Sequence, residues 1–313
     1  MTKKNCTLVT GISGLLGYGV VRAFFHQGQV VGTYHHHPVG FPGIEAVPLD
    51  LTLPEDIRSL VHDTKPNIVI HCAASTDVDY CQDHPAEAHA VNVEGTATLA
   101  REAAQVGALM VYISTDSVFD GSRGMYSETD PVQPVNVYSG SKVAAEDAVR
   151  RSGGAHLILR TNFFGWSSGP KKSLAEWMLR LLQDSKRLPA FSDVTFSPLF
   201  VDDLGPLIAD ACNKGLRGLY HLAARDACTK LAFAHMLARQ AELDFRLIMP
   251  TRSMDRQQRA PRPSNTSLRV EKISAALGKE MPTVQEGITR FLAFESRRIR
   301  RAPFGASVET GLP

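Results

Sequence analysis

The stretch CTLVTGISGLLGYGVVRAFFHQG, residues 6–28, decides the fold. Its first part, CTLVT (6–10), is a short apolar and β-branched run that predicts a buried strand. The residues after it predict a glycine-rich turn and then a helix that extends to about Gln27. A strand, a glycine turn and a helix in this order are typical of a βα unit whose helix N-terminus holds a phosphate.

Glycines give this turn its predicted chemistry. Gly11, Gly14 and Gly17 follow the spacing GxxGxxG directly after the strand. A dinucleotide pyrophosphate needs a tight turn, a backbone without Cβ atoms in the way, and free N–H groups at a helix N-terminus. The predicted cofactor contacts in this segment are therefore Gly11, Ser13, Gly14, Leu15, Leu16 and Gly17.

Strand-like and helical patterns alternate along the rest of the first half. Further strands are predicted at 29–34, 44–51, 67–73, 108–115 and 155–161, and another at 218–224. This alternation predicts an α/β fold, a Rossmann-type doubly wound parallel sheet with a smaller C-terminal substrate-binding subdomain. We expect an NAD(P)-binding domain over 1–165 and a substrate-binding subdomain over 166–300. Segments at about 196–224 should return to the Rossmann core, and 301–313 should form a flexible tail.

Composition narrows the function classes. The chain has 313 residues, a net charge of +2 and 43% apolar residues, so no nucleic-acid or anionic-membrane partner is indicated. The basic and then apolar start is broken by glycines and lacks a cleavage site, so it is not read as a signal peptide, and no run is long enough to span a membrane. The cysteines form no CxxC pair, and we expect free thiols in a reducing cytoplasm: Cys6, Cys72, Cys81, Cys212 and Cys228.

The end of the second predicted strand bears on the choice of cofactor. GTYHHHPVG has no Asp or Glu, the residue that usually holds the ribose 2′-hydroxyl of NAD. Thr33, Tyr34 and His35 are instead candidates for a 2′-phosphate, which favours NADPH and leaves NADH possible. Consecutive histidines point alternately to opposite faces, so no metal site is expected. Asp50 is placed either to reach the adenine edge or to flank a helix.

The segment YSGSK (138–142) contains two candidate catalytic residues. Tyr138 and Lys142 lie four apart, on one helix face. Reduction of a ketone requires a proton at the carbonyl oxygen, and a nearby ammonium is expected to lower the pKa of a tyrosine that supplies it. Thr115 ends a predicted strand, at the sheet edge where ligands of open α/β sheets bind, and offers a second hydrogen bond.

Five further segments make the chain similar to a known family. They are CAASTDVDYCQDHPAEAHAVNVEGT (72–96), ISTDSVFDG (113–121), YSETDPVQPVNVYSGSK (126–142), LRTNFFGW (159–166) and RPSNTSL (262–268). With the glycine turn they resemble the extended short-chain dehydrogenases/reductases, and among these the dTDP-4-dehydrorhamnose reductase group, over about residues 5–295. The resemblance implies an oxidoreductase of carbohydrate biosynthesis that reduces a keto group on a nucleotide sugar.

The resemblance also implies roles for individual residues. Thr115, Tyr138 and Lys142 match the catalytic residues, and Asn92 matches an asparagine that braces the neighbouring strand. The implied cofactor contacts beyond the glycine turn are Tyr34, His35, Asp50, Leu51, Cys72, Ala73, Ala74, Tyr138 and Lys142. The implied substrate contacts are Thr76, Asp116, Val118, Asn162, Trp166, Arg262 and Asn265.

Some of these roles have alternatives. Arg160 and Arg262 would suit a pyrophosphate as an arginine pair, or the Arg262 loop is held by surface ion pairs. Trp166 stacks on a base or sugar, or simply packs. Asp202 and Asp203 are expected to cap the following helix, and Glu128 to orient the loop before the catalytic helix.

Two other function classes stay open. One is an epimerase that retains its NAD. The other is a non-catalytic cofactor-binding subunit, like the regulatory subunit of methionine adenosyltransferase. A dehydratase is disfavoured because Asp116 and Ser117 replace the expected Asp–Glu pair, and Ser117 also departs from the usual STDYVFDG motif. The chain is a possible homodimer.

Overall fold

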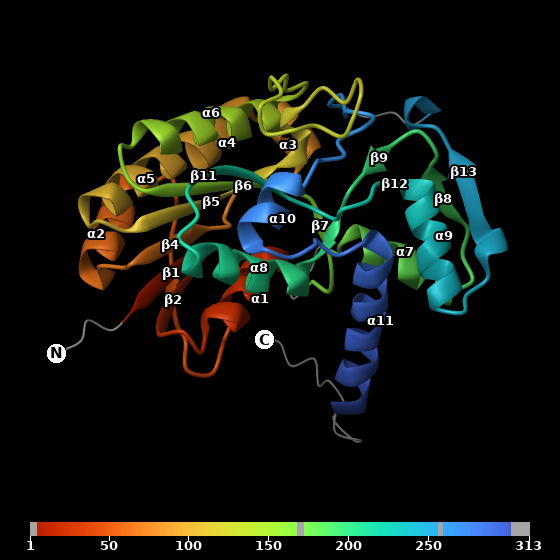
Figure 1. Cartoon of the computed structure of the whole chain (residues 1–313), viewed down its shortest axis with the longest axis horizontal. Coiled ribbons are helices and arrows are strands. Elements are labelled where there is room, and N and C mark those ends of the chain that lie inside the picture. Colours follow the sequence, from red (N-terminus) through yellow and green to blue (C-terminus); the bar gives the residue numbers. More distant parts are fainter. Residues whose placement is uncertain (1–4, 168–171, 256–258, 302–313) are drawn as a thin grey trace, which may run out of the picture.

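The computed structural model describes residues 5–167, 172–255 and 259–301. Its centre is a parallel sheet of seven strands in the order β11-β6-β5-β4-β1-β2-β3 (Figure 1). The strands are β1 (Cys6–Thr10), β2 (Gln29–Tyr34), β3 (Glu45–Pro48), β4 (Ile68–His71), β5 (Leu109–Thr115), β6 (His156–Thr161) and β11 (Gly218–Leu222). The predicted Rossmann-type parallel sheet is confirmed.

The strands are apolar along their length because both faces of the sheet are covered. Leu8 and Met110 pack on one face, under α2 (Pro54–Thr64), α5 (Thr96–Gln105) and α6 (Val137–Arg151). Val9 and Val111 pack on the other face, under α1 (Leu15–Phe24) and α8 (Val201–Asn213). Figure 1 shows these two helix layers on opposite sides of the sheet.

The start of α6 is fixed by local sequence. Asn136 is its N-cap and accepts a hydrogen bond from the backbone N–H of Ser139 at 2.9 Å, within a capping box. Pro131 and Pro134 precede the cap in a segment without regular structure. Tyr138 therefore lies in the first turn of α6, and Lys142 one turn further on.

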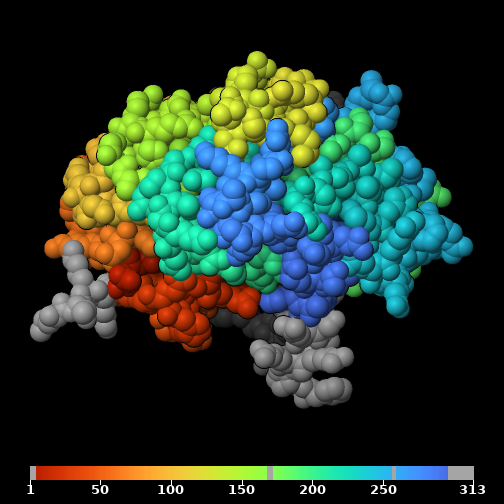
Figure 2. Space-filling view, viewed as in Figure 1, coloured from red at the N-terminus to blue at the C-terminus, as the bar shows by residue number. Residues whose placement is uncertain are grey.

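The later part of the chain builds smaller pairs of strands beside the sheet. These are β7 (Phe163–Phe164) with β10 (Leu199–Phe200), β8 (Leu188–Phe191) with β13 (Ile248–Thr251), and β9 (Thr195–Phe196) with β12 (Cys228–Thr229). They pack with α7 (Leu174–Gln183), α9 (Lys230–Gln240) and α11 (Val284–Arg301) around Phe164, Phe233 and Phe291. Figure 2 shows the blue segment that contains α10 (Glu271–Leu277) lying against the teal α8–β11 region.

The helical stretch between β4 and β5 is not one continuous helix. α3 (Val78–Asp83) and α4 (Pro85–His89) are followed by a π-helical turn, η1 (Ala90–Gly95), before α5 begins. Such a turn carries one extra residue and is often found at functional sites. Here it carries Asn92, which is buried.

Two smaller expectations need correction. Asp202 and Asp203 lie in the first turn of α8 and do not cap it: the N-cap is Phe200, and the carboxylates pair with Arg22 and Arg290. Of the predicted tail, Arg301 is the last residue of α11, and 302–313 lie outside the described residues. In the described parts of the chain, no helix is both long and apolar enough to cross a membrane.

Candidate active site

Two adjoining cavities lie along the carboxyl ends of the central strands. Each has a volume of about 560 Å³, and they share the lining residues Ser13, Gly14, Leu15, Leu16, Cys72, Ala74, Thr76 and Phe163. Tyr34, His35 and Asp50 line one end of this combined site, and Thr115, Tyr138 and Lys142 line the other. An elongated site that runs from a glycine turn to a tyrosine–lysine pair has the form a dinucleotide requires.

The glycine turn is shaped for a backbone-lined phosphate site. Gly11 has φ of +72°, and a Cβ there would lie 2.9 Å from the backbone N of Ala73. A Cβ on Gly17 would lie 2.2 Å from the carbonyl O of Gly11, so α1 approaches the turn as closely as it does only because Gly17 has no side chain. Gly14 is the N-cap of α1 without a side-chain capping bond, which leaves this helix N-terminus suited to an anion.

The far end of the site holds His35 and Asp50. Asp50 accepts hydrogen bonds from the backbone N and hydroxyl of Thr52 at 2.8 and 2.7 Å, and these lower its pKa. Its other oxygen is 3.6 Å from Nε2 of His35. Asp50 therefore both flanks α2 and lines the cavity, as does Leu51.

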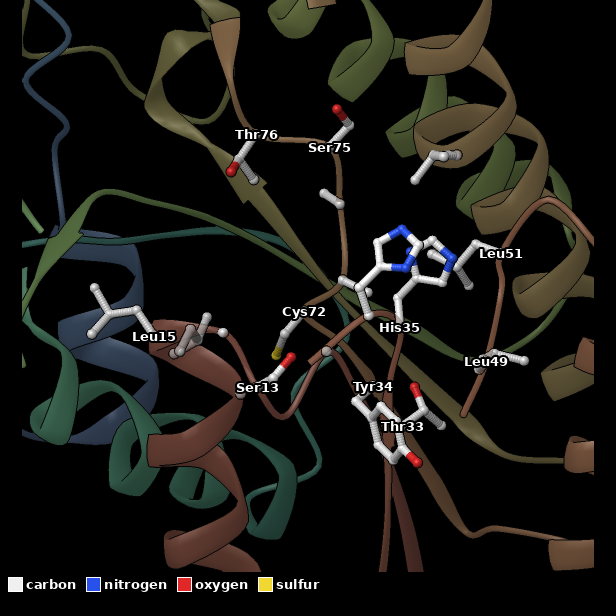
Figure 3. A pocket seen from close by; sticks show the side chains of 18 of the residues that line it. Ser13, Leu15, Thr33, Tyr34, His35, Leu49, Leu51, Cys72, Ser75 and Thr76 are labelled. Atoms are coloured by element: carbon white, nitrogen blue, oxygen red, sulfur yellow. The ribbon is translucent and has the colours of Figure 1, made fainter. Parts of the chain in front are cut away.

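Figure 3 shows the His35 ring on the side of the cavity where Leu51 lies. The rings of His35 and His36 are 3.6 Å apart between centroids. Among the described residues, no group of three or more His, Cys, Asp or Glu side chains is arranged to hold a metal ion.

Lys142 is almost fully buried below the opposite end of the site. Its Nζ donates to the carbonyl O of Ile113 at 2.8 Å and lies 4.2 Å from the ring centroid of Tyr112. Burial lowers the pKa of Lys142 to about 7, against the opposing effect of Glu146. The ammonium thus faces the end of β5, where Thr115 is the last residue.

Tyr138 has a different electrostatic state from the one expected. Burial raises its pKa to about 12, although a hydrogen bond with Thr115 lowers it in part. From the sequence, Lys142 was expected to lower this pKa. Burial dominates instead, and the Lys142 ammonium donates to the carbonyl O of Ile113. A raised pKa keeps Tyr138 protonated at neutral pH, which is the form a proton donor needs.

Thr115 and Asn92 are held by neighbouring backbone and side chains. The Thr115 hydroxyl accepts from the backbone N of Ser117 at 3.1 Å and donates to Asp116 Oδ1 at 3.2 Å. Asn92 accepts from the backbone N of Ser75 at 2.8 Å and donates to Ser141 Oγ at 2.9 Å. The expected bracing role of Asn92 is therefore seen, between the segment after β4 and α6.

The predicted substrate contacts divide into two groups. Thr76 and Asn162 line the cavities. Asp116 lines neither: it is buried and accepts hydrogen bonds from Asn162 Nδ2 at 2.8 Å and Thr266 Oγ1 at 2.5 Å. Val118 is fully buried in the core. Their side chains position the lining of the site rather than form it.

Trp166 is a packing residue in this structure. Its ring stacks on Phe291 at 4.4 Å between centroids, and its Nε1 donates to the Phe291 carbonyl O at 2.9 Å. It lines neither cavity, so of the two roles left open for it, packing is the one observed.

The arginine pair predicted for a pyrophosphate does not form. Arg160 is buried and donates Nε and Nη2 to Glu146 at 2.8 Å each, so it is not available to a ligand. Arg262 is partly exposed and pairs with Asp79 at 3.1 Å. Asn265 donates to the Arg123 carbonyl O at 3.3 Å and so ties its loop to the segment that follows β5.

Several residues that line the cavities were not predicted from the sequence. Phe163 lies between the cavities, and Lys172 and Ser173 line the catalytic end. Phe163 directly follows Asn162, so its place after the sixth strand was the available signal. Lys172 and Ser173 belong to none of the motifs that the sequence offered. Glu128 accepts from the backbone N of His221 at 2.9 Å, which ties the loop before α6 to β11.

Comparisons with known proteins place these features in context. Residues 5–296 match the RmlD substrate binding domain family. The chain is 32% identical over 285 residues to the probable low-salt glycan biosynthesis reductase Agl14 of Haloferax volcanii, covering 90% of this chain and 95% of that protein. It is 31% identical over 298 residues to dTDP-4-dehydrorhamnose reductase of Escherichia coli K12, covering 91% and 96%.

Solved structures show the same architecture. The dTDP-4-dehydrorhamnose reductase of Bacillus anthracis, in complex with NADP, superposes with a TM-score of 0.81 at 27% identity, covering 93% of this chain and all of that one (100%). The UDP-glucose 4-epimerase of Thermotoga maritima gives a TM-score of 0.82 at 19% identity, covering 94% and 99%, which shows a common fold.

Proposed function

The chain belongs to the RmlD substrate binding domain family, and on that premise we propose that it reduces the 4-keto group of a nucleotide-linked 6-deoxy sugar with NADPH. It is an NAD(P)-dependent oxidoreductase of the short-chain dehydrogenase/reductase type. One observation carries the proposal: Thr115, Tyr138 and Lys142 line the same continuous site as the glycine turn.

The residues of the site fit a dinucleotide. The turn around Gly11, Gly14 and Gly17 packs tightly against α1 and Ala73 only because Cβ atoms are absent there. Such a tight turn at a helix N-terminus is the kind of site that takes a pyrophosphate. With a dinucleotide bound, Lys142 would donate to the nicotinamide ribose, and the backbone at Ala73 and Ala74 would pass beside it; all three residues line the cavities. NADPH, when bound, supplies the hydride.

The side chains perform the proton chemistry. Tyr138 donates its phenolic proton to the carbonyl oxygen as that oxygen gains negative charge. Thr115 donates a second hydrogen bond to the same oxygen, and preorganised donors of this kind each contribute a few kcal/mol to lowering the barrier. The Lys142 ammonium stabilises the phenolate that remains.

The preference for NADPH follows from the far end of the site. No acidic residue ends β2, and the neighbouring rings of His35 and His36 line the cavity. Imidazoles that gain a proton attract a 2′-phosphate. Asp50 beside His35 opposes this attraction, so the preference should be moderate.

Substrate is proposed to bind at the catalytic end, against Thr76, Asn162 and Lys172. Arg262 and Asn265 remain proposed contacts for the nucleotide. For Arg262 this means exchanging its pair with Asp79 for a phosphate. Because a guanidinium binds a phosphate in a bidentate manner, the exchange is chemically reasonable.

The test is turnover with a panel of nucleotide-linked 4-keto-6-deoxy sugars. We expect loss of NADPH absorbance with at least one sugar and a product that has gained two hydrogen atoms. Measurable NADPH binding without oxidation by any sugar would favour a regulatory subunit. Conversion of a sugar without net NADPH oxidation would favour an epimerase.

A further inference from the structure

A buried charge cluster lies directly behind the catalytic side chains. Glu146 is on α6, one helical turn beyond Lys142, and its side chain is fully buried. Arg160 on β6 donates to both of its carboxylate oxygens at 2.8 Å. Ser114 on β5 donates its hydroxyl to Glu146 Oε1 at 2.6 Å. One carboxylate therefore joins α6, β5 and β6, which lie together in Figure 1.

These three elements carry the proposed catalytic groups. Ser114 lies between Ile113, whose carbonyl accepts from Lys142, and Thr115. On β6, Arg160 immediately precedes Thr161 and Asn162, which line the catalytic end of the site. A displacement of the Glu146 carboxylate would therefore move the end of β5, which carries Thr115, and the end of β6, which leads to Asn162. These two strand ends lie on the two sides of the proposed position of the reacting carbonyl.

We propose that Glu146 is a positioning residue: it fixes where Thr115 lies relative to Lys142, and it places a buried negative charge one helical turn from the Lys142 ammonium. It acts through Ser114, Arg160 and the charge on Lys142, without touching substrate or cofactor. The inference rests on the proposed function, since it takes Thr115 and Lys142 to be the groups that act on the carbonyl and the cofactor.

The charges around Lys142 support the electrostatic part of the proposed role of Glu146. Burial disfavours the Lys142 ammonium, and the Glu146 carboxylate opposes that effect. Burial also works against ionisation of Glu146, but its contacts with Arg160, Ser114 and Arg150 outweigh this and leave its pKa lowered. Arg150 Nη2 donates to Glu146 Oε2 at 2.9 Å. Glu146 is therefore a negative charge at neutral pH. The other titratable groups around the ammonium are Tyr138 on the same helix, Tyr112 on β5, His71 on β4 and Cys72 after it.

A merely structural ion pair is the competing interpretation, and the chain offers a matched control. Glu102 on α5 is equally buried and accepts hydrogen bonds from His62 at 3.1 Å and Arg101 at 3.2 Å. It lies at the α2–α5 contact and lines neither cavity. Glu102→Gln should reproduce the loss of stability that follows from removing a buried carboxylate, without affecting the candidate active site.

The test compares Glu146→Gln with Glu102→Gln in the full chain. With a turned-over sugar, we expect kcat to fall about 10- to 100-fold for Glu146→Gln, the size of a small misplacement of catalytic groups. The Glu102 variant should keep a kcat near wild type at a similar melting temperature. Equal and small losses of kcat in both variants would overturn the proposal.

A second readout needs no sugar substrate. Fluorescence titration with NADH, which carries no 2′-phosphate, should show affinity falling as pH rises through deprotonation of Lys142. In Glu146→Gln the midpoint of this fall should move to lower pH by about one unit, and in Glu102→Gln it should not move. An unmoved midpoint in Glu146→Gln would overturn the electrostatic half of the role. Because binding alone is measured, this result stands even if no sugar is reduced.

Ser114→Ala keeps the Glu146–Arg160 pair and removes the Ser114 hydroxyl, which links Glu146 to β5 and belongs to a residue that lines the catalytic end of the site. This variant is useful if Glu146→Gln does not fold. We expect Ser114→Ala to lower kcat several-fold, which is the range given by loss of one buried hydrogen bond. The pH midpoint of the fall in NADH affinity should stay unchanged. An unchanged kcat would show that the link to β5 does not position Thr115.

Discussion

The buried ammonium of Lys142 is predicted to lower the free energy of unfolding of the protein. Burial brings the pKa of its ammonium from 10.5 to about 7. Each pKa unit corresponds to 1.36 kcal/mol, so holding this side chain charged in the folded protein costs up to about 5 kcal/mol. The hydrogen bond to Ile113 and the contact with the Tyr112 ring offset part of that cost.

The sign of the pH dependence follows from the direction of the pKa change. Below about pH 7 the lysine is protonated in both folded and unfolded chains, and the full penalty applies. As pH rises from about 7 toward 10.5, the folded protein releases the proton first, so the stability of the wild type rises. Lys142→Met lacks this proton and should be more stable than wild type at about pH 6. Its advantage should shrink by about 2–3 kcal/mol by about pH 9.

Urea unfolding of both proteins at the two pH values measures this difference. Titrating groups that Lys142 does not affect are common to both chains and cancel in the comparison. His71 and Cys72 do feel the charge of Lys142, but their pKa values of about 3 and about 12 lie outside the range from pH 6 to pH 9. Lys186→Met is the control, since Lys186 is exposed and pairs with Asp184 at the surface. A stability difference between Lys142→Met and wild type that does not change with pH would refute the reasoning.

The other predictions concern the site itself. Tyr138→Phe should lower kcat by about 10²- to 10⁴-fold, as loss of a general acid does, while the NADPH dissociation constant measured by fluorescence stays near wild type; near-wild-type turnover would remove Tyr138 as the acid. Gly17→Ala places a Cβ 2.2 Å from the Gly11 carbonyl O, so NADPH binding should be lost or fall steeply in calorimetry, and unchanged affinity would mean that the turn has another shape. His35→Asn should weaken NADPH binding more than NADH binding, and the reverse order would contradict the NADPH preference. Trp166→Leu should lower the melting temperature because its stacking on Phe291 is lost, and a rise in sugar KM without a loss of stability would show instead that it contacts substrate.

Much of the fold was readable from local chemistry. Buried parallel strands such as CTLVT and LMVYIST are apolar on both sides, and their alternation with helical segments fixes the layer order. The close approach of α1 to its turn is encoded by Gly11 and Gly17. The π-helical turn at Asn92 was not predicted, because an inserted residue within a helix leaves no periodic signal strong enough to detect.

The place of a site residue could be predicted where it depends on one strand or helix. It was harder to predict where contacts between several elements decide it. Thr115, Tyr138 and Lys142 lie where strand and helix ends place them. Asp116 and Val118 are next to Thr115 in sequence, yet a 3₁₀ turn, η2 (Asp116–Val118), directs both side chains inward. The partners that decide such cases, Thr266 for Asp116 and Phe291 for Trp166, are more than a hundred residues away in sequence and unmarked by any pattern.

Hydride transfer itself is the most direct test of the central claim. The measurement uses NADPH deuterated at nicotinamide C4 with a nucleotide-linked 4-keto-6-deoxy sugar, and mass spectrometry and NMR of the product. Wild type is predicted to place deuterium on sugar C4, and Tyr138→Phe to do so far more slowly despite binding NADPH. Absence of deuterium at sugar C4 with every sugar tested, from wild-type protein that binds NADPH, would contradict the proposed function.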